Sequence, residues 1–260
     1  MSGPAPADVA ESRRGPARRA VGPGRAGALT YRLVLRQLTS PGRIVALTAL
    51  SLVATVAGFA LGQADDADAA QAGAELMAGM GLAVVVPVVA LVFAGASIGD
   101  LRDDKTLVYL WLRPMDRWPI VVGAAAAALT IAAPIALLPV LAGAALTGGG
   151  GGVVAGTAAS AAVGMVAYTG VFTLFGVWLR RFIVWGLAYI LIWEGFIAQA
   201  GNGVAAVAIR TYTRSILVAI ADVDLDQADV GTAAGFLVPL GAAVVALVLA
   251  SWRLDTQDID

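Results

Sequence analysis

Long apolar runs separated by short polar stretches make up most of the chain. A helix needs about 20 mainly apolar residues, within a range of roughly 17 to 25, to cross the hydrocarbon of a bilayer. Six runs have this length, so the pattern predicts an all-α integral membrane protein with six transmembrane helices. The predicted spans are residues 44–61, 77–98, 120–146, 153–179, 182–200 and 232–252.

The composition agrees with this fold class and excludes several kinds of chemistry. Of the 260 residues, 59% are hydrophobic and 13% are charged, whereas about a quarter of the residues of a soluble domain are charged. The sequence has no histidine and no cysteine, so it cannot build a Ser-His-Asp triad or the usual zinc sites. We therefore expect no enzyme activity, no metal site and no nucleic-acid partner.

Basic residues near the ends of the predicted spans indicate how the chain is oriented. Of the 17 Lys and Arg residues, all but Arg210 and Arg214 lie before the first span, after the second, after the fourth or after the sixth. Lys and Arg are retained on the cytoplasmic side, so both termini are predicted to be cytoplasmic. The opposite side carries acidic residues, which are Asp65, Asp66, Asp68, Glu75, Asp222, Asp224, Asp226 and Asp229.

The region in front of the first span divides into an arm and a short helix. Residues 1–26 are rich in Pro, Gly, Ala and Arg and are predicted to be a disordered cytoplasmic arm, followed by a membrane domain over residues 27–260. Within residues 28–39, Arg32 and Arg36 share one helical stripe, with apolar side chains opposite them. This arrangement is typical of a helix that lies in the plane of the membrane interface.

Glu194 is the one carboxylate within the six predicted spans. Ionisable groups in lipid cost free energy and often mark functional sites, so Glu194 is a candidate for the transport path or an outer gate. The alternative is a structural role, in which Glu194 lies where the fifth span leaves the lipid and forms an ion pair with Arg210 or Arg214. Both arginines belong to residues 204–220, whose pattern predicts a helix on the outer side between the fifth and sixth spans.

The connection between the second and third spans, residues 99–117, differs from the other connections. Charges of both signs alternate there with Leu107, Leu110, Trp111 and Leu112. A helix hairpin closes with a few polar residues, so this mixture indicates a surface that binds another protein. The alternative is a solvated loop that only follows the charge bias, with its Leu and Trp side chains in the membrane interface.

The layout of the spans and this connection resemble the ABC-2 type permease family, the membrane subunit of ABC exporters. The sequence GDLRDDKTLVYLWLRPMDRWPIVV, residues 99–122, looks like the signature loop of the family, in which charged residues lead into Thr-Leu and then an Arg-Pro-x-x-Arg turn. Trp-Glu-Gly at 193–195, followed by Ile-Arg-Thr-Tyr at 209–212, is a second likeness. Two positions depart from the family pattern, since Lys105 stands where glycine is frequent and Leu101 where glutamate is usual.

The resemblance implies that residues 100–107 form or adjoin a coupling helix that seats in a groove of an ABC ATP-binding subunit. The residues that it assigns to ATPase coupling are Asp100, Arg102, Asp103, Asp104, Lys105, Thr106, Leu107, Arg113, Pro114 and Arg117. It also implies an exporter in a bacterial-type inner (plasma) membrane, with two ATP-binding subunits and two permease subunits, identical or related. This chain would bind no cofactor, and its partner would bind ATP and Mg.

Two other classes of function stay open. An ion-coupled secondary transporter would need ionisable residues within the spans, where only Glu194 qualifies. A non-transporting scaffold or accessory subunit of a larger membrane assembly would need no ATP-binding partner. For an exporter, the Ala, Val, Leu, Gly and Thr side chains of the spans favour an amphiphilic or apolar cargo over an ion.

Overall fold

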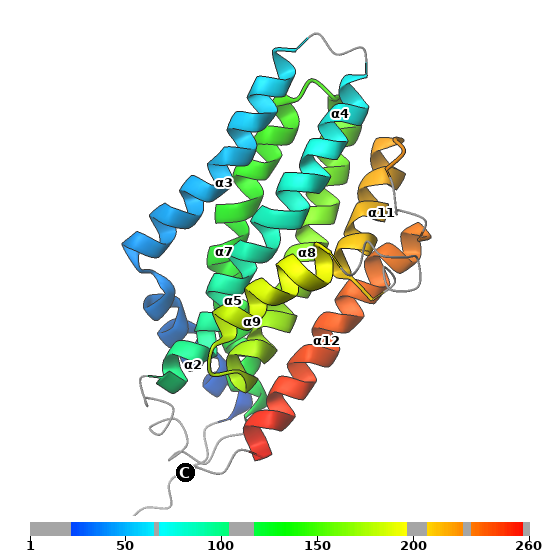
Figure 1. The fold of residues 1–260 in the computed structure, drawn as a ribbon. Coiled ribbons are helices and arrows are strands. Elements are labelled where there is room, and N and C mark those ends of the chain that lie inside the picture. The colour runs from blue at the N-terminus through cyan, green and yellow to red at the C-terminus, as the bar shows by residue number, and fades with distance from the viewer. Residues whose placement is uncertain (1–21, 65–67, 104–116, 197–206, 226–229, 257–260) are drawn as a thin grey trace, which may run out of the picture.

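The computed structural model describes residues 22–64, 68–103, 117–196, 207–225 and 230–256, and these residues form helices and no strand. Within them, five helices are long and apolar enough to cross a membrane (Figure 1). The all-α part of the predicted fold class is confirmed for the described residues, and the five helices are compatible with a multi-pass membrane protein. The five helices are α3 (Pro41–Gly62), the continuous helix Ala69–Asp100, α7 (Trp118–Leu146), α8 (Gly150–Trp178) and α12 (Thr232–Thr256).

The second of these helices changes its winding along its length. It consists of α4 (Ala69–Leu76), the π-helix η1 (Met77–Val85) and α5 (Val86–Asp103). The Asp68 side chain accepts a hydrogen bond from the backbone N–H of Gln71 at 3.4 Å and caps the first turn. α4 places 8 helical residues in front of the predicted span 77–98. The hydropathy pattern did not include them, because Gln71 and Glu75 make this stretch too polar.

The fifth predicted span, residues 182–200, is not confirmed. Its described part consists of α9 (Phe182–Ala188), with 7 residues, and the π-helix η2 (Tyr189–Glu194), with 6 residues. At about 1.5 Å per residue the two cover about 20 Å, which is less than the roughly 30 Å of hydrocarbon. Residues 197–206 lie outside the described residues. The chain continues in α11 (Ile209–Ala221), which occupies most of the outer helix predicted for residues 204–220.

Small residues let the helices of the bundle approach closely. In the most hydrophobic window of each helix, 78% of the residues of α8 are buried, against 22% for α3 and 28% for α12, so α8 is central and the other two are peripheral. A Cβ atom added to Gly176 of α8 would lie 2.4 Å from the backbone oxygen of Gly95 of α5. A Cβ atom on Gly58 of α3 would lie 2.2 Å from the backbone oxygen of Gly143 of α7. In lipid, such close contacts are a main source of helix association.

Helix α2 (Pro23–Leu38), the first in the described part of the chain, packs along α7 at one end of the bundle (Figure 1). A Cβ atom on Gly123 of α7 would lie 2.6 Å from the backbone oxygen of Gly27. The helix begins at Pro23, a residue favoured in a first turn, so residues 23–26 are helical and not part of the predicted disordered arm. Its placement in the membrane interface stays a prediction. One stripe of α2 is buried, namely Ala26, Thr30, Val34 and Leu38.

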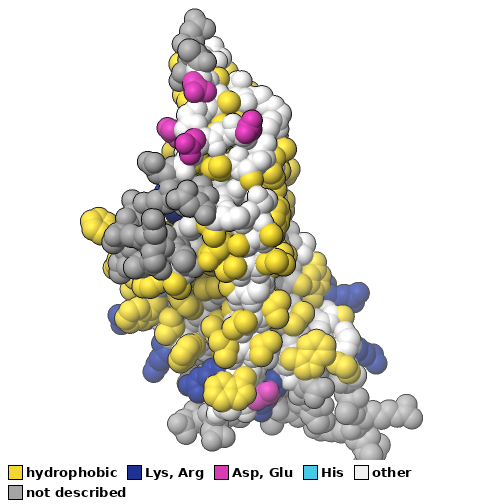
Figure 2. Space-filling view, turned by 90° about the vertical axis from the view of Figure 1, so that its right-hand side faces the viewer, with side chains coloured by type: hydrophobic (Ala, Val, Ile, Leu, Met, Phe, Trp, Pro, Cys, Tyr) yellow, Lys and Arg dark blue, Asp and Glu magenta, His cyan; other side chains and the backbone are white. Residues whose placement is uncertain are grey.

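Charged side chains of opposite sign gather toward opposite ends of the bundle, with a hydrophobic band between them (Figure 2). Acidic residues lie at the end where α4 begins and α11 ends, and these are Asp68, Glu75, Asp222 and Asp224. Basic residues gather at the end that holds α2 and the α8–α9 connection, and they include Arg25, Arg32, Arg36, Arg180 and Arg181. The asymmetry agrees with the predicted orientation, in which the basic end faces the cytoplasm.

Candidate functional site

A buried polar cluster lies at the end of η2. Glu194 is only 2% exposed. The hydroxyl group of Tyr168, on α8, donates a hydrogen bond to Oε2 of Glu194, and the hydroxyl group of Tyr189 donates to Oε1 at 3.0 Å. The backbone N–H of Ile209, at the start of α11, donates to the same carboxyl group. Glu194 therefore links three segments, namely η2, α8 and α11.

The π-helical winding of η2 brings Tyr189 and Glu194 to one side of the segment. In an α-helix, side chains five residues apart point about 140° apart around the axis. In η2 the backbone bonds span five residues, as in the bond from the N–H of Gly195 to the carbonyl of Ile190 at 3.0 Å. The wider turn lets Tyr189 reach Glu194, so the local winding builds this part of the site.

Aromatic contacts hold the two tyrosines in place. Tyr168 stacks on Phe172 with ring centroids 5.8 Å apart. Tyr189 meets Phe172 and Phe175 edge to face, with centroid distances of 6.1 Å and 5.9 Å. These contacts cover the apolar parts of the rings, and the hydroxyl groups face Glu194. Because a buried hydroxyl and a buried carboxyl group each need a partner, the pairing satisfies both.

The two arginines predicted to form an ion pair with Glu194 do not do so. Within the described ranges, the ion pairs are Arg43 with Asp100 and Arg117 with Asp255. Arg210 is next to Ile209 at the start of α11, and its charge acts on Glu194 only over a longer distance. Arg214 lies one turn further along α11. The predicted direct pairing with Arg210 or Arg214 is therefore wrong, and two tyrosine hydroxyl groups take its place.

Sequence reasoning missed both tyrosines. Tyr168 stands in a predicted span otherwise dominated by Ala, Gly, Val and Thr, and a tyrosine hydroxyl there needs a hydrogen-bond partner. That requirement is a signal that could have pointed to Glu194. Nothing in the sequence signals Tyr189, because its contact with Glu194 depends on the π-helical turn.

The two ends of the predicted coupling loop are attached to two different helices. At the first end of the loop, the carboxylate of Asp100 on α5 lies 3.0 Å from the guanidinium group of Arg43 at the start of α3. After the loop, the guanidinium group of Arg117 donates to the backbone oxygen of Leu254 and lies 3.7 Å from the carboxylate of Asp255. Both acceptors belong to the end of α12. The ion pairs are partly exposed, so each contributes about 1 kcal/mol or less, and their main effect is on position.

The structure describes the ends of this loop but not its predicted docking surface. Asp100, Arg102 and Asp103 belong to the last turns of α5, and Arg117 directly precedes α7. The other residues assigned to coupling lie outside the described residues, and they are Asp104, Lys105, Thr106, Leu107, Arg113 and Pro114.

The start of α9 packs against the same end of α5. A Cβ atom added to Gly95 would lie 2.3 Å from the ring of Phe182, and one added to Gly99 would lie 2.6 Å from it. The buried ring of Phe182 therefore lies directly over two glycines. A larger residue at either glycine position would occupy the space of the ring. The first turn of α9 is therefore in direct contact with the last turns of α5. The same segment continues through η2 to Glu194.

Comparison with protein-family models found no matching family, and comparison with curated proteins found no matching protein.

Proposed function

We propose that this chain is the membrane-spanning permease subunit of an ATP-driven ABC export system of the ABC-2 type. Two permease subunits, identical or related, form the translocation path, and two copies of a separate ATP-binding subunit drive transport. ATP and Mg bind to those partners. The complex resides in a bacterial-type inner (plasma) membrane, with six crossings per permease subunit and both termini in the cytoplasm.

The observation that carries this proposal is the attachment of the loop 99–117 to helices on two flanks of the bundle (Figure 1). Asp100 ties its first end to α3, and Arg117 ties its second end to α12. A protein that binds the loop therefore acts on α5 and α7, which the loop connects, and on α3 and α12, to which its ends are tied, that is, on four of the five candidate spans. Such an arrangement suits the transmission of a rigid-body movement from a partner to the membrane helices.

The packing around Phe182 extends this connection into the membrane. When the partner displaces the loop, the end of α5 moves, and the ring of Phe182 over Gly95 and Gly99 passes the movement to α9 and η2. The hydrogen bonds of Glu194 to Tyr168 and Tyr189 keep the far end of this segment attached to α8. In this mechanism α9 and η2 tilt about a fixed end and change the width of the path.

The surroundings of Glu194 favour a structural role over ion coupling. A carrier of protons or sodium ions must expose its carboxyl group to water on each side in turn. Glu194 is buried, and it accepts hydrogen bonds from two tyrosine hydroxyl groups and one backbone N–H. For the exporter, the apolar and small side chains of the spans favour an amphiphilic or apolar cargo taken from the cytoplasm or the inner leaflet.

The test of the proposal is a charge reversal in the loop. We expect the double variant Asp103→Lys and Asp104→Lys to insert normally but to lose cargo-stimulated ATP hydrolysis in the complex with the ATP-binding subunit, because the rim charges of the coupling helix then repel their groove. The measurement is the ATPase rate of the reconstituted complex with and without a panel of amphiphilic compounds.

The matched control reverses two charges on the same predicted side, outside the loop, with Arg32→Glu and Arg36→Glu. These exposed residues lie on α2, which has no part in the proposed transmission, and the control should keep its stimulated ATPase rate. Unchanged stimulation in the loop variant would refute the docking role. Failure of an ABC ATP-binding subunit to co-purify with the unaltered chain would instead support a non-transporting scaffold.

A further inference from the structure

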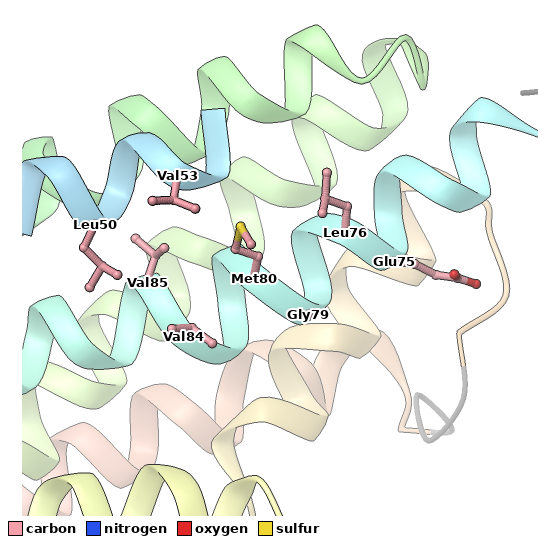
Figure 3. Close-up of a pocket in the computed structure, with 8 residues that line it drawn as sticks. All are labelled: Leu50, Val53, Glu75, Leu76, Gly79, Met80, Val84 and Val85. Carbon is pink, nitrogen blue, oxygen red and sulfur yellow. The ribbon is translucent and has the colours of Figure 1, made fainter. Parts of the chain in front are cut away.

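A groove runs between α3 and the second long helix (Figure 3). Its volume is about 380 Å³, which is within the range of about 300 to 1,000 Å³ usual for small-molecule sites. Apolar side chains line it from both helices, with Leu50 and Val53 on α3 and Leu76, Met80, Val84 and Val85 on α4 and η1. The groove therefore offers an apolar surface that is open on one side.

The backbone of the two helices explains why the groove is not filled. α3 is held to α7 on its other side, where Gly58 meets Gly143 and the hydroxyl of Thr55 donates to the backbone oxygen of Pro139 at 2.7 Å. Across the groove from α3, Gly79 of η1 has no side chain, and a Cβ atom added there would have no heavy atom within 4 Å. The missing side chain and the wide π-helical turn of η1 leave the space open.

One end of the groove is charged. Glu75 is the only charged residue among those that line it, and it lies at the end of the row farthest from Leu50 (Figure 3). Its Oε1 atom accepts a hydrogen bond from the side-chain amide of Gln71 at 2.9 Å. Among the residues that the structure describes, no Lys or Arg forms an ion pair with Glu75. This end is also the acidic end of the molecule, so its electrostatic potential is negative.

The groove and the carboxylate together select a chemical class of ligand. The apolar lining disfavours a hydrophilic molecule, because such a molecule would lose its water without gaining hydrogen bonds. The carboxylate at one end disfavours an anion and complements a positive charge. We propose that this groove is a binding site for amphiphilic cations, in which the apolar body lies along η1 and the positive charge lies next to Glu75. The site belongs to this chain alone and does not depend on the proposed export function.

The test uses a pair of hydrophobic ions of the same shape and opposite charge. The full-length protein is placed in nanodiscs of phosphatidylcholine, and binding of tetraphenylphosphonium and of tetraphenylborate is measured, with empty nanodiscs subtracted. We expect saturable binding of the cation and no saturable binding of the anion. We expect Glu75→Gln to weaken cation binding by about fivefold, as for one partly exposed ionic contact. Gly79→Trp should abolish cation binding by filling the groove.

Two control variants match these changes. Asp224→Asn removes one charge from the same end of the molecule, at a residue that does not line the groove. Gly241→Trp adds the same side chain to a glycine of α12 that also has no heavy atom within 4 Å of a Cβ atom. Both controls should bind tetraphenylphosphonium like the unaltered protein.

Several outcomes would overturn the proposal. Equal binding of the cation and the anion, or unchanged binding by Glu75→Gln, would show an apolar groove that takes lipid acyl chains without regard to charge. Conversion of a dimer into a monomer by Gly79→Trp, measured by light scattering, would show that a second copy of the chain covers the groove. If Gly79→Trp fails to fold, two measurements still test the proposed cation site. These are the binding of tetraphenylphosphonium by the isosteric Glu75→Gln variant and the comparison of tetraphenylphosphonium with tetraphenylborate.

Discussion

Tyr168 and Glu194 illustrate what a single polar contact does inside an apolar bundle. Neither side chain can reach water, so the hydroxyl group of Tyr168 depends on Glu194 as its acceptor, and Tyr168 is one of three donors that satisfy Glu194. A buried donor or acceptor that loses its partner costs about 1 to 3 kcal/mol. The hydroxyl group of Tyr168 therefore contributes to the stability of the segment that contains η2, together with the other two donors to Glu194.

This dependence predicts the effect of removing the hydroxyl group. Tyr168→Phe keeps the ring and its stacking on Phe172 but leaves Oε2 of Glu194 without its donor. We expect it to lower the free energy of unfolding by about 1 to 3 kcal/mol. Thermal unfolding followed by tryptophan fluorescence in detergent measures the change.

The control for this prediction is Tyr31→Phe. The hydroxyl group of Tyr31 donates to Oγ1 of Thr130 at 3.2 Å in an exposed position, where water can replace it. We expect a loss of about 0.5 kcal/mol or less. Equal losses in the two variants would contradict the role assigned to Tyr168.

At the scale of whole helices, the positions of the glycines decide which faces can meet. Gly176 of α8 lies against the backbone of α5, whereas Gly241 of α12 has open space around it. A larger residue in place of Gly176 would overlap the backbone of α5, whereas Gly241 only lowers the helix propensity of α12. The two should respond in opposite directions to the same small substitution.

We expect Gly176→Ala to lower the free energy of unfolding by about 1 to 3 kcal/mol, because the added methyl group overlaps the backbone oxygen of Gly95. Gly241→Ala should raise the free energy of unfolding by up to about 1 kcal/mol, through a better helix propensity. Chemical denaturation in mixed micelles measures both changes. A stabilising effect of Gly176→Ala would show that α5 and α8 are not in close contact.

Element types could be predicted from the sequence, whereas their boundaries and winding could not. Hydropathy located the helices of the first, third, fourth and sixth predicted spans. A long apolar run in lipid forms a helix, because its backbone N–H and C=O groups have no water to bind. The helix that contains the second predicted span begins 8 residues before that span, at Ala69, because the polar Gln71 and Glu75 hide this part of the helix from a hydropathy pattern. The π-helical turns in η1 and η2 have no residue pattern that predicts them. The tyrosine partners of Glu194 follow from that winding and were missed with it.

At the scale of the whole molecule, the separation of acidic and basic ends is the main feature (Figure 2). Positively charged segments stay in the cytoplasm during insertion, so this separation agrees with the predicted orientation of the chain. The predicted fifth crossing lies between Arg181 and Asp224, where α9 and η2 are too short to span the bilayer by themselves. The sidedness of these two residues therefore tests the complete topology.

A sequence without cysteine makes this test direct. We expect the single variant Asp224→Cys to react with a membrane-impermeant maleimide in intact cells, because residue 224 is exposed at the acidic end. Arg181→Cys, exposed at the basic end, should react only after the membrane is permeabilised. Reaction of both variants from the same side would mean that the intervening segment does not cross the membrane.

The contact between Gly27 of α2 and Gly123 of α7 also affects how the protein is made. The ribosome synthesises the surface that receives α2 roughly 90 residues after α2 itself, which takes on the order of 5 to 20 s at usual rates of translation. During that interval the nascent amino-terminal helix lacks its native neighbour while the first two spans pass through the insertion machinery. The buried stripe of α2 must then be sheltered by lipid or by an insertion factor until α7 arrives.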